Sequence, residues 1–262
     1  MKPTIIVTGK TIASTWEEAL LKLHNEGKDY PGRYWTEGTP IGKQCHMIMR
    51  VEDFCGEPRV HKGFTCTPED LWDYRREILE GSTRAWSYTY ESRMVHWGLN
   101  KKDGYIVNDD DINQLEYAID CLVRKPDSHK AVLTLGDPRS DSVRGGAGTH
   151  IPCLRHVSLE LEKNKDNKYV LNMFTHWRAR NSVHASFNNM FGLSFLMESI
   201  ASKLTIQMKE EILTGSYIDQ SDDFHYNGKD SFFMESFIKQ YSRPAEEKYW
   251  TTAQLKDAIG DD

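Results

Sequence analysis

The most reactive side chain that the sequence offers is the thiol of Cys153, in the segment H-I-P-C-L. This cysteine follows a glycine-rich stretch and a proline, and it comes directly before a strand-like run. We expect a thiol at such a junction to be partly exposed, and nearby cationic groups would favour the nucleophilic thiolate. A buried, unreactive side chain is the ordinary alternative for any single cysteine.

A dense polar segment, H-W-R-A-R-N-S-V-H-A-S-F-N-N-M-F-G-L at 176–193, precedes the longest apolar stretch of the chain. It combines two arginines with three asparagines and two histidines. Two interpretations fit these residue types equally well: a solvated turn with a helix cap, or an anion site lined by hydrogen-bonding side chains.

The composition excludes several classes of protein. The chain has 262 residues, 39% of them hydrophobic and 11% aromatic, which is typical of a globular protein. No apolar run approaches the ~18 residues of a membrane span. With 33 basic and 39 acidic residues, the chain does not resemble a binder of nucleic acid polymers.

The cysteines and the start of the chain indicate a cellular compartment. Five irregularly spaced cysteines without a C-x-x-C pair argue against a disulfide framework and against a zinc site, so we expect no metal. The first residues, M-K-P-T-I-I-V-T-G-K-T, lack the pattern of a signal peptide. We therefore expect a reduced, cytoplasmic protein.

The elements that must position these residues follow from apolar periodicity and from helix start and stop signals. The pattern predicts helices over 15–26, 66–81, 111–128 and 189–204, strands over 44–53 and 130–137, and two hairpin-linked strands within 155–179. Two long segments, 137–153 and 218–230, are predicted to be irregular, and long irregular segments are often functional. The mixed order predicts an α+β fold, with 1–262 as a single domain.

Five motifs that occur in a fixed order resemble the thymidylate synthase family, most closely its short archaeal-type branch. An arginine, Arg178, also follows the cysteine at about the spacing that the family shows. The motifs are Y-T-Y-x-x-R at 88–93, P-x-S at 126–130, P-C at 152–153, N-N-M-F-G-L at 188–193 and D-x-H at 223–225. Together they extend over most of 66–227.

This resemblance implies a thymidylate synthase-like mixed sheet packed by long helices, and a homodimer. It also implies transfer of a one-carbon unit from 5,10-methylenetetrahydrofolate, or a related reduced pterin, to C5 of dUMP. In this chemistry a cysteine thiolate adds to C6 of the uracil ring and makes C5 nucleophilic. The product of the methylation is dTMP.

The resemblance assigns three catalytic residues. Cys153 is the nucleophile. Glu77, in R-R-E-I-L-E-G, would organise water and assist proton transfer, although a surface helix residue is an equal alternative. Tyr90 would join a proton network, with Tyr88 as the second choice and a packed aromatic ring as the alternative.

The resemblance also assigns residues to the nucleotide. Arg178 would bind the phosphate, because its guanidinium fork suits phosphate oxygens. The Asn189 amide would donate to O4 and accept from N3–H of uracil, unless it is a helix N-cap. Asp223 and His225, in the D-x-H triplet, would contact the sugar, with an exposed loop histidine as the alternative.

Several positions depart from the family pattern. His129 and Lys130 stand where the family has an arginine pair that reaches the phosphate in the partner subunit, and Lys130 keeps a positive charge. Asn181 replaces an aspartate that lies near the folate ring in the family. The segment that carries folate-packing tryptophans in the common branch is short here.

These departures keep other functions open. Water that enters the site would give a hydroxymethyl product, so a dUMP hydroxymethylase is the main alternative. A non-catalytic nucleotide-binding member of the family is a second alternative. A cysteine hydrolase that pairs Cys153 with His150 or His156 is a third, and no hydrolase motif accompanies it.

Overall fold

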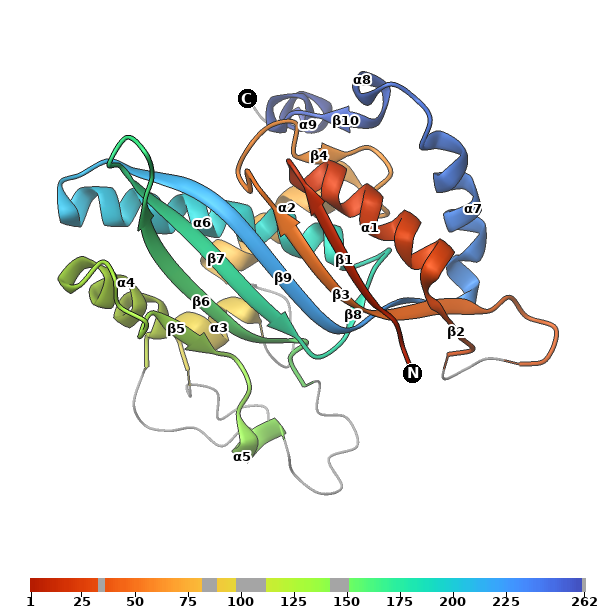
Figure 1. Ribbon diagram of the computed structural model, residues 1–262, viewed down its shortest axis with the longest axis horizontal. Helices are drawn as coiled ribbons and strands as arrows, with labels where there is room; N and C mark the ends of the chain where they lie inside the picture. The colour runs from red at the N-terminus through yellow and green to blue at the C-terminus, as the bar shows by residue number, and fades with distance from the viewer. Residues whose placement is uncertain (33–35, 82–88, 98–111, 142–150, 261–262) are drawn as a thin grey trace.

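A mixed β-sheet forms the frame of the protein (Figure 1). The structure is a computed structural model, and it describes residues 1–32, 36–81, 89–97, 112–141 and 151–260. The strands of the sheet are β1 (Thr4–Gly9), β2 (Lys28–Tyr30), β3 (Gly42–Val51), β5 (Val132–Thr134), β6 (Leu154–Lys163), β7 (Tyr169–Trp177), β8 (Arg180–Asn181) and β9 (Ile212–Tyr226).

The strand order is β1-β3-β9-β7-β6-β5, with β2 added to β3 and β8 added to β9. The pairs β1–β3, β7–β9 and β8–β9 are parallel, whereas β3–β9, β6–β7 and β5–β6 are antiparallel. A small second sheet joins β4 (Val60–His61) to β10 (Tyr249–Trp250). Strand β9 is therefore central, and it links the two halves of the main sheet.

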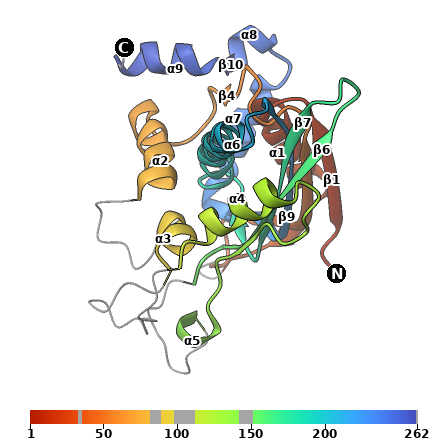
Figure 2. The same cartoon turned by 90° about the vertical axis from the view of Figure 1, so that its left-hand side faces the viewer.

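The helices of the described residues lie on one side of this sheet (Figure 2). They are α1 (Ile12–Glu26), α2 (Pro68–Glu80), α3 (Tyr90–Val95), α4 (Gln114–Arg124), α5 (Pro138–Asp141), α6 (Ser186–Met208), α7 (Ser231–Gln240), α8 (Ala245–Lys248) and α9 (Thr252–Ile259). Helices α1, α4 and α6 pack on the strands, and α2 packs on α6 farther from the sheet. The α+β fold predicted from the sequence is confirmed. The single-domain division over 1–262 stays a prediction.

Helix α6 is the centre of the hydrophobic core. Its residues Phe187, Phe191, Met197 and Leu204 are buried, and the buried positions lie around the whole helix. A helix that is apolar on all sides must be covered on all sides. The sheet covers one side of α6 and α2 covers another. The predicted helix over 189–204 is confirmed, and it begins three residues earlier than predicted.

The predicted helix over 66–81 is confirmed as α2, together with its end signals. The Thr67 hydroxyl accepts from the backbone N–H of Asp70 at 3.1 Å, and Pro68 is the first helical residue. At the other end Gly81 has a φ of +83°, a conformation that residues with a Cβ rarely adopt. The hairpin of β6 and β7 is also confirmed.

The acidic segment 218–230, predicted to be irregular, is mostly strand. Residues 218–226 form the second half of β9, and a short 3-10 turn follows at Gly228–Asp230. Local polarity misled the prediction, because the inward-facing Asp219 has a buried cationic partner on β8. In the other predicted irregular segment, 137–153, residues 138–141 form α5, and residues 142–150 lie outside the described part of the chain.

Among the helices that the structure describes, none combines the length and the apolar character that a membrane crossing needs.

Candidate active site

Cys153 and Arg178 are neighbours at one end of the sheet, where β6 begins and β7 ends. Leu154 pairs with Trp177 across these antiparallel strands, so Cys153 and Arg178 are the next residues outward. The backbone N–H of Arg178 donates to the carbonyl oxygen of Cys153 at 2.9 Å. The hairpin thus brings the two residues together.

The side chain of Arg178 is held against the segment that precedes the cysteine. Its Nε donates to the carbonyl oxygen of Pro152 at 3.1 Å, and its Nη2 donates to that of Ile151 at 2.7 Å. Within the described residues, two of the five N–H groups of this guanidinium have acceptors, one on Nε and one on Nη2. Because Arg178 is exposed, the guanidinium can present its other N–H groups to an anion beside Cys153.

Cys153 itself is half-buried and packs against the edge of the hydrophobic core. This partial exposure is what the sequence predicts for a thiol at the junction before β6. Within the described residues, no cluster of three or more histidines, cysteines or acidic side chains is arranged to hold a metal ion.

Trp177 connects the cysteine end of β6 with the helices. The ring of Tyr90, the first residue of α3, meets the Trp177 ring edge-on, with the centroids 5.8 Å apart. On the same indole ring lies the guanidinium carbon of Arg180, 4.1 Å from the centroid. Tyr90 is therefore close to the end of the sheet that carries Cys153, and a packed aromatic ring is part of its role. Tyr88, the second choice, lies outside the described residues.

Arg180 is a buried residue to which sequence reasoning assigned no role. Its Nη1 forms an ion pair with Asp219 of β9, and both side chains are almost completely buried. Its Nη2 donates to the carbonyl oxygen of Ser186, the first residue of α6, at 2.9 Å. The Nε atom is buried and has no acceptor among the described residues. Burial lowers the pKa of this guanidinium. Arg180 thus ties the start of α6 to the sheet.

The carboxylate of Asp219 is the centre of a buried network. Tyr217 donates its hydroxyl proton to Oδ2 at 2.7 Å, and Ser221 donates to Oδ1 at 3.0 Å. Burial raises the pKa of Tyr217, so the phenol stays protonated. The inward spacing of residues 217, 219 and 221 along β9 is the sequence signal that would have found this network.

Asn189 is buried on the first turns of α6 and contacts α2. Its Nδ2 donates to the hydroxyl oxygen of Tyr74 at 2.5 Å, and the residue is 6% exposed. The N-cap alternative is wrong, because the helix begins at Ser186 and its N-cap residue is Ala185. The amide of Asn189 is therefore available for a role other than capping.

Glu77 lies on α2, three residues after Tyr74, and is half-buried. Residues three apart share one side of a helix, so Glu77 and Tyr74 are neighbours on the side that approaches α6. Glu77 has an interaction within the protein, as has Tyr90. The structure therefore leaves the proton-transfer role of Glu77 a prediction.

Asp223 and His225 lie near the end of β9. The Nδ1 atom of His225 is 3.2 Å from the Asp223 carboxylate, and Lys2 donates to the same carboxylate at 3.0 Å. Burial alone would raise the pKa of Asp223, but the bonds to His225 and Lys2 lower it. His225 is mostly buried in a strand, so the exposed-loop alternative is wrong.

Asn181 joins this region through β8, where it pairs with His225. Its carbonyl oxygen Oδ1 accepts from the backbone N–H groups of Val183 at 3.0 Å and His184 at 2.7 Å. These bonds fix the turn that leads into α6. The side-chain oxygen of Asn181 thus has a structural task that the sequence did not indicate.

Lys130 does not lie beside Cys153 within one chain. It is exposed on the connection between α4 and β5, ahead of Val132, which pairs with Ser158 in β6. The five residues from Cys153 to Ser158 extend over roughly 17 Å of strand, and Lys130 lies beyond that point. A contact between Lys130 and a phosphate beside Cys153 therefore requires a second subunit.

Several known proteins with similar sequences come from archaea. The chain is 25% identical to a Methanosarcina barkeri protein over 200 residues, which are 76% of this chain and 81% of the relative. It is 26% identical to a Methanocaldococcus jannaschii protein over 232 residues, 88% of this chain and 94% of the relative. Both relatives carry the name "Putative thymidylate synthase". Over most of its length the chain is thus similar to thymidylate synthase-like proteins of the short archaeal branch.

A third relative, from Methanothermobacter thermautotrophicus, has the same name and is 25% identical over 211 residues, 75% of this chain and 84% of its own length. No protein-family model matches the chain. The resemblance predicted from the motifs is thus confirmed by whole-sequence similarity. The roles of the individual residues remain predictions.

Proposed function

We propose that this thymidylate synthase-like protein transfers a one-carbon unit to C5 of a uracil nucleotide, dUMP, and that Cys153 is its nucleophile. Arg178 supports this proposal most directly. Its two hydrogen bonds to the carbonyl oxygens before Cys153 hold a cation next to the thiol. A nucleotide phosphate bound by this guanidinium would bring its base within reach of the sulfur.

The chain's own groups divide the chemistry in the following way. The Cys153 thiolate adds to C6 of the ring, and the electron pair moves to C5, which becomes the nucleophile. Asn189 binds the O4 and N3 edge of the base, and Asp223 with His225 binds the sugar. Glu77 and Tyr90 take part in removing the proton from C5 after the new carbon bond has formed. When bound, the reduced folate would give up its bond to the transferred carbon and supply the hydride that completes the methyl group, and the Cys153 thiolate then leaves C6.

A reduced folate, methylenetetrahydrofolate or a related pterin, would supply the carbon unit. Asn181 cannot replace the aspartate that lies near the folate ring in the family. Its side chain is an uncharged amide, and the amide oxygen already accepts from two backbone N–H groups. Asn181 therefore has no part in the proposed reaction. This observation favours hydroxymethylation, completed by water, as the second candidate function.

Release of tritium from dUMP labelled at C5, in the presence of methylenetetrahydrofolate, tests the proposal. We expect the unaltered protein to release tritium and Cys153→Ala to lose at least about 10³-fold in rate. Cys121→Ala, which removes a buried thiol on α4, is the matched control and should keep its rate within about twofold.

The outcomes separate the candidate functions. Mass spectrometry of the nucleotide product distinguishes a methyl from a hydroxymethyl group. Absence of release from the unaltered protein, with dUMP binding that survives Cys153→Ala, would overturn the enzymatic proposal and leave a non-catalytic nucleotide-binding protein.

We also propose that two copies form a homodimer through the side of the sheet that the described helices leave uncovered (Figure 2). Strand β1 presents Thr4, Ile6 and Thr8 on that side, and Ile6 is 61% exposed. A dimer would cover this apolar side chain and give Lys130 a route to the phosphate bound by the partner subunit.

Sedimentation equilibrium tests the homodimer. Ile6→Asp should shift the protein towards monomer, and a monomeric unaltered protein would contradict the proposal.

A further inference from the structure

The contact between Tyr74 and Asn189 joins a phenol on α2 to the amide on α6 that is proposed to bind the base. Asn189 donates from Nδ2, so the hydroxyl oxygen of Tyr74 is the acceptor. At 6% exposure the amide has almost no contact with bulk water. A buried amide is oriented by its protein partners, because its oxygen and nitrogen ends have the same shape. A hydroxyl can bond to either end, and here it accepts from the nitrogen end.

Gly192 brings the Tyr74 ring to this position. A Cβ atom at Gly192 would lie 2.8 Å from Cγ1 of Ile78 and 3.4 Å from Cδ1 and Cε1 of Tyr74. The missing side chain therefore lets α2 approach α6 closely, and it does so one helical turn after Asn189. The ring lies against the glycine, and its hydroxyl reaches the amide. Helix packing thus holds the acceptor in place, independently of any ligand.

We infer that Tyr74 is a positioning residue that sets the orientation of the Asn189 amide and thereby favours uracil over cytosine. The inference rests on the proposed function, in which Asn189 binds the edge of the base. Tyr74 acts through Asn189 and need not touch the nucleotide.

The preference follows from the donors and acceptors that remain. With one Nδ2 hydrogen bonded to Tyr74, the amide still offers its second Nδ2 hydrogen and its oxygen Oδ1. These match the O4 acceptor and the N3–H donor of uracil. Cytosine presents an amino donor at C4 and an unprotonated N3 acceptor, so the same orientation opposes donor to donor and acceptor to acceptor. Mismatched polar groups in a buried site are rejected strongly.

Binding of dUMP and of dCMP, measured by calorimetry for the unaltered protein and for Tyr74→Phe, tests the inference. Phenylalanine keeps the ring against Gly192 and removes only the hydroxyl. We expect dUMP affinity to fall about 5- to 10-fold, and the preference for dUMP over dCMP to fall by at least that factor, because the freed amide can rotate. Tyr241→Phe, which removes an exposed hydroxyl that faces Glu18, should change neither value.

An equal loss of affinity for both nucleotides, with the preference unchanged, would overturn the inference and leave the proposed function in place. Failure of the unaltered protein to bind dUMP would instead overturn the proposed function and, with it, this inference. The side-chain amide signal of Asn189 in the NMR spectrum, assigned with Asn189→Asp, gives a test without ligand. It should shift in Tyr74→Phe and not in Tyr241→Phe, and an unchanged signal in Tyr74→Phe would overturn the inference.

Discussion

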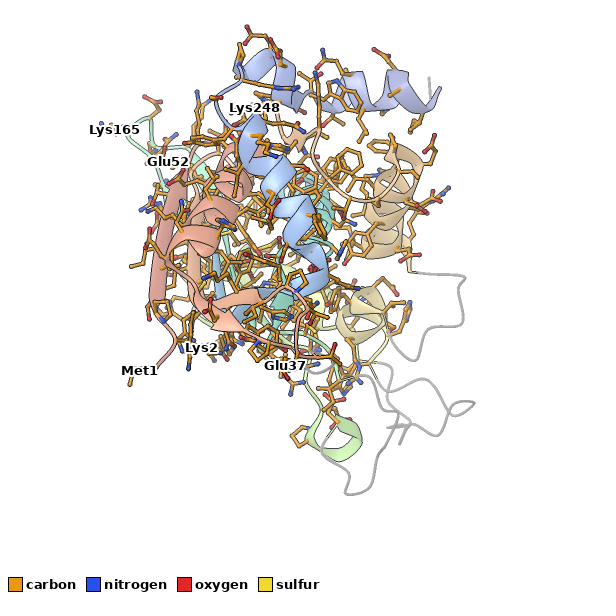
Figure 3. All side chains as sticks on the ribbon, turned by 90° about the vertical axis from the view of Figure 1, so that its right-hand side faces the viewer. Met1, Lys2, Glu37, Glu52, Lys165 and Lys248 are labelled. Carbon is orange, nitrogen blue, oxygen red and sulfur yellow. The ribbon has the colours of Figure 1, made fainter. Side chains whose placement is uncertain are left out.

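Two buried clusters of charged groups, on either side of the Trp16 indole, use different designs. The site cluster (Arg180, Asp219, Tyr217 and Ser221) lies inside the sheet next to the candidate active site. The clasp cluster, centred on Glu17 of α1, ties down the C-terminal segment. Figure 3 labels Lys248 of the clasp cluster near α7.

In the clasp cluster one carboxylate serves three partners. Lys248 lies 2.9 Å from Oε1 of Glu17, and the Tyr249 hydroxyl donates to Oε2. The Nδ1 atom of His61 accepts from the backbone N–H of Gly63 at 2.9 Å, so Nε2 carries the proton. That Nε2 faces Glu17 Oε1 at 3.5 Å, which is longer than a normal hydrogen bond.

The difference shows what each cluster is for. The clasp cluster gives its carboxylate a partner on each oxygen and holds a segment that begins at Ala245. Each cluster leaves one buried nitrogen without a hydrogen-bond partner among the described residues, Nε of Arg180 in the site cluster and Nε2 of His61 in the clasp cluster. An unsatisfied buried group costs about 1–3 kcal/mol in either place. The clusters therefore differ in what their carboxylates hold: Asp219 ties the start of α6 to the sheet through Arg180, and Glu17 ties the C-terminal segment to α1.

Arg180→Met should have the largest effect, because it leaves the Asp219 carboxylate buried and unpaired. We expect a loss of about 3–5 kcal/mol in the free energy of unfolding, measured by urea denaturation. The double variant Arg180→Met with Asp219→Asn removes the unpaired charge and should recover part of this loss. A single variant as stable as the unaltered protein would show that the ion pair does not hold α6 to the sheet.

Glu17→Gln should have a smaller effect that is confined to the clasp cluster. The amide keeps the shape of the side chain but loses the charge that pairs with Lys248. We expect a loss of about 1–3 kcal/mol in unfolding free energy and faster proteolysis of the segment after Pro244. Tritium release from dUMP should stay within about twofold. A large loss of tritium release would contradict a role of the clasp cluster that is confined to stability.

The pH dependence of stability should come from the clasp cluster and should be the smallest effect. Burial lowers the pKa of His61 below its ordinary 6.5, although Glu17 opposes this shift. Just below pH 6.5 His61 is protonated in the unfolded chain but still neutral in the folded chain. The free energy of unfolding therefore falls as the pH drops below 6.5. Burial would raise the pKa of Glu17, but its hydrogen bonds lower it, so Glu17 adds a loss in the same direction below 4.5.

His61→Gln isolates this dependence. Urea unfolding between pH 7.5 and 5.5 should show a shallower slope for the variant, by at most about 1.4 kcal/mol per pH unit. Burial also lowers the pKa of His24 and of His156, so the difference between variant and unaltered protein is the quantity to compare. Arg180 keeps its proton throughout this range. Identical slopes for His61→Gln and the unaltered protein would show that His61 does not cause the pH dependence of stability.

Local signals in the sequence predicted the elements that carry the candidate site. The cap at Thr67 and the stop at Gly81 bounded α2, and the polar hairpin after Lys163 joined β6 to β7. Such signals depend on residues a few positions apart, so they can be read without the fold. The sequence linked Cys153 and Arg178 only through the family resemblance, whereas the strand register that makes them neighbours is a property of the folded hairpin.

The central strand β9 and the partner of Asn189 were missed for a common reason. Residues 218–226 carry three aspartates and resemble a loop when their polarity is considered alone. Asp219 is tolerated inside because Arg180, from a different strand, neutralises it. Tyr74 reaches Asn189 only because Gly192 lets two helices approach. No local pattern reports contacts between such distant positions.

The amino-acid sequence alone determined the resemblance to the thymidylate synthase family, the α+β class and the residue types that carry the proposed chemistry, because motif order and apolar periodicity are properties of the chain itself. The tertiary structure alone decided that Arg178 is anchored beside Cys153, that Arg180 lies buried beneath the start of α6, and that Tyr74 holds the Asn189 amide. These arrangements depend on strand register and helix approach, which arise when distant segments pack together and exclude water.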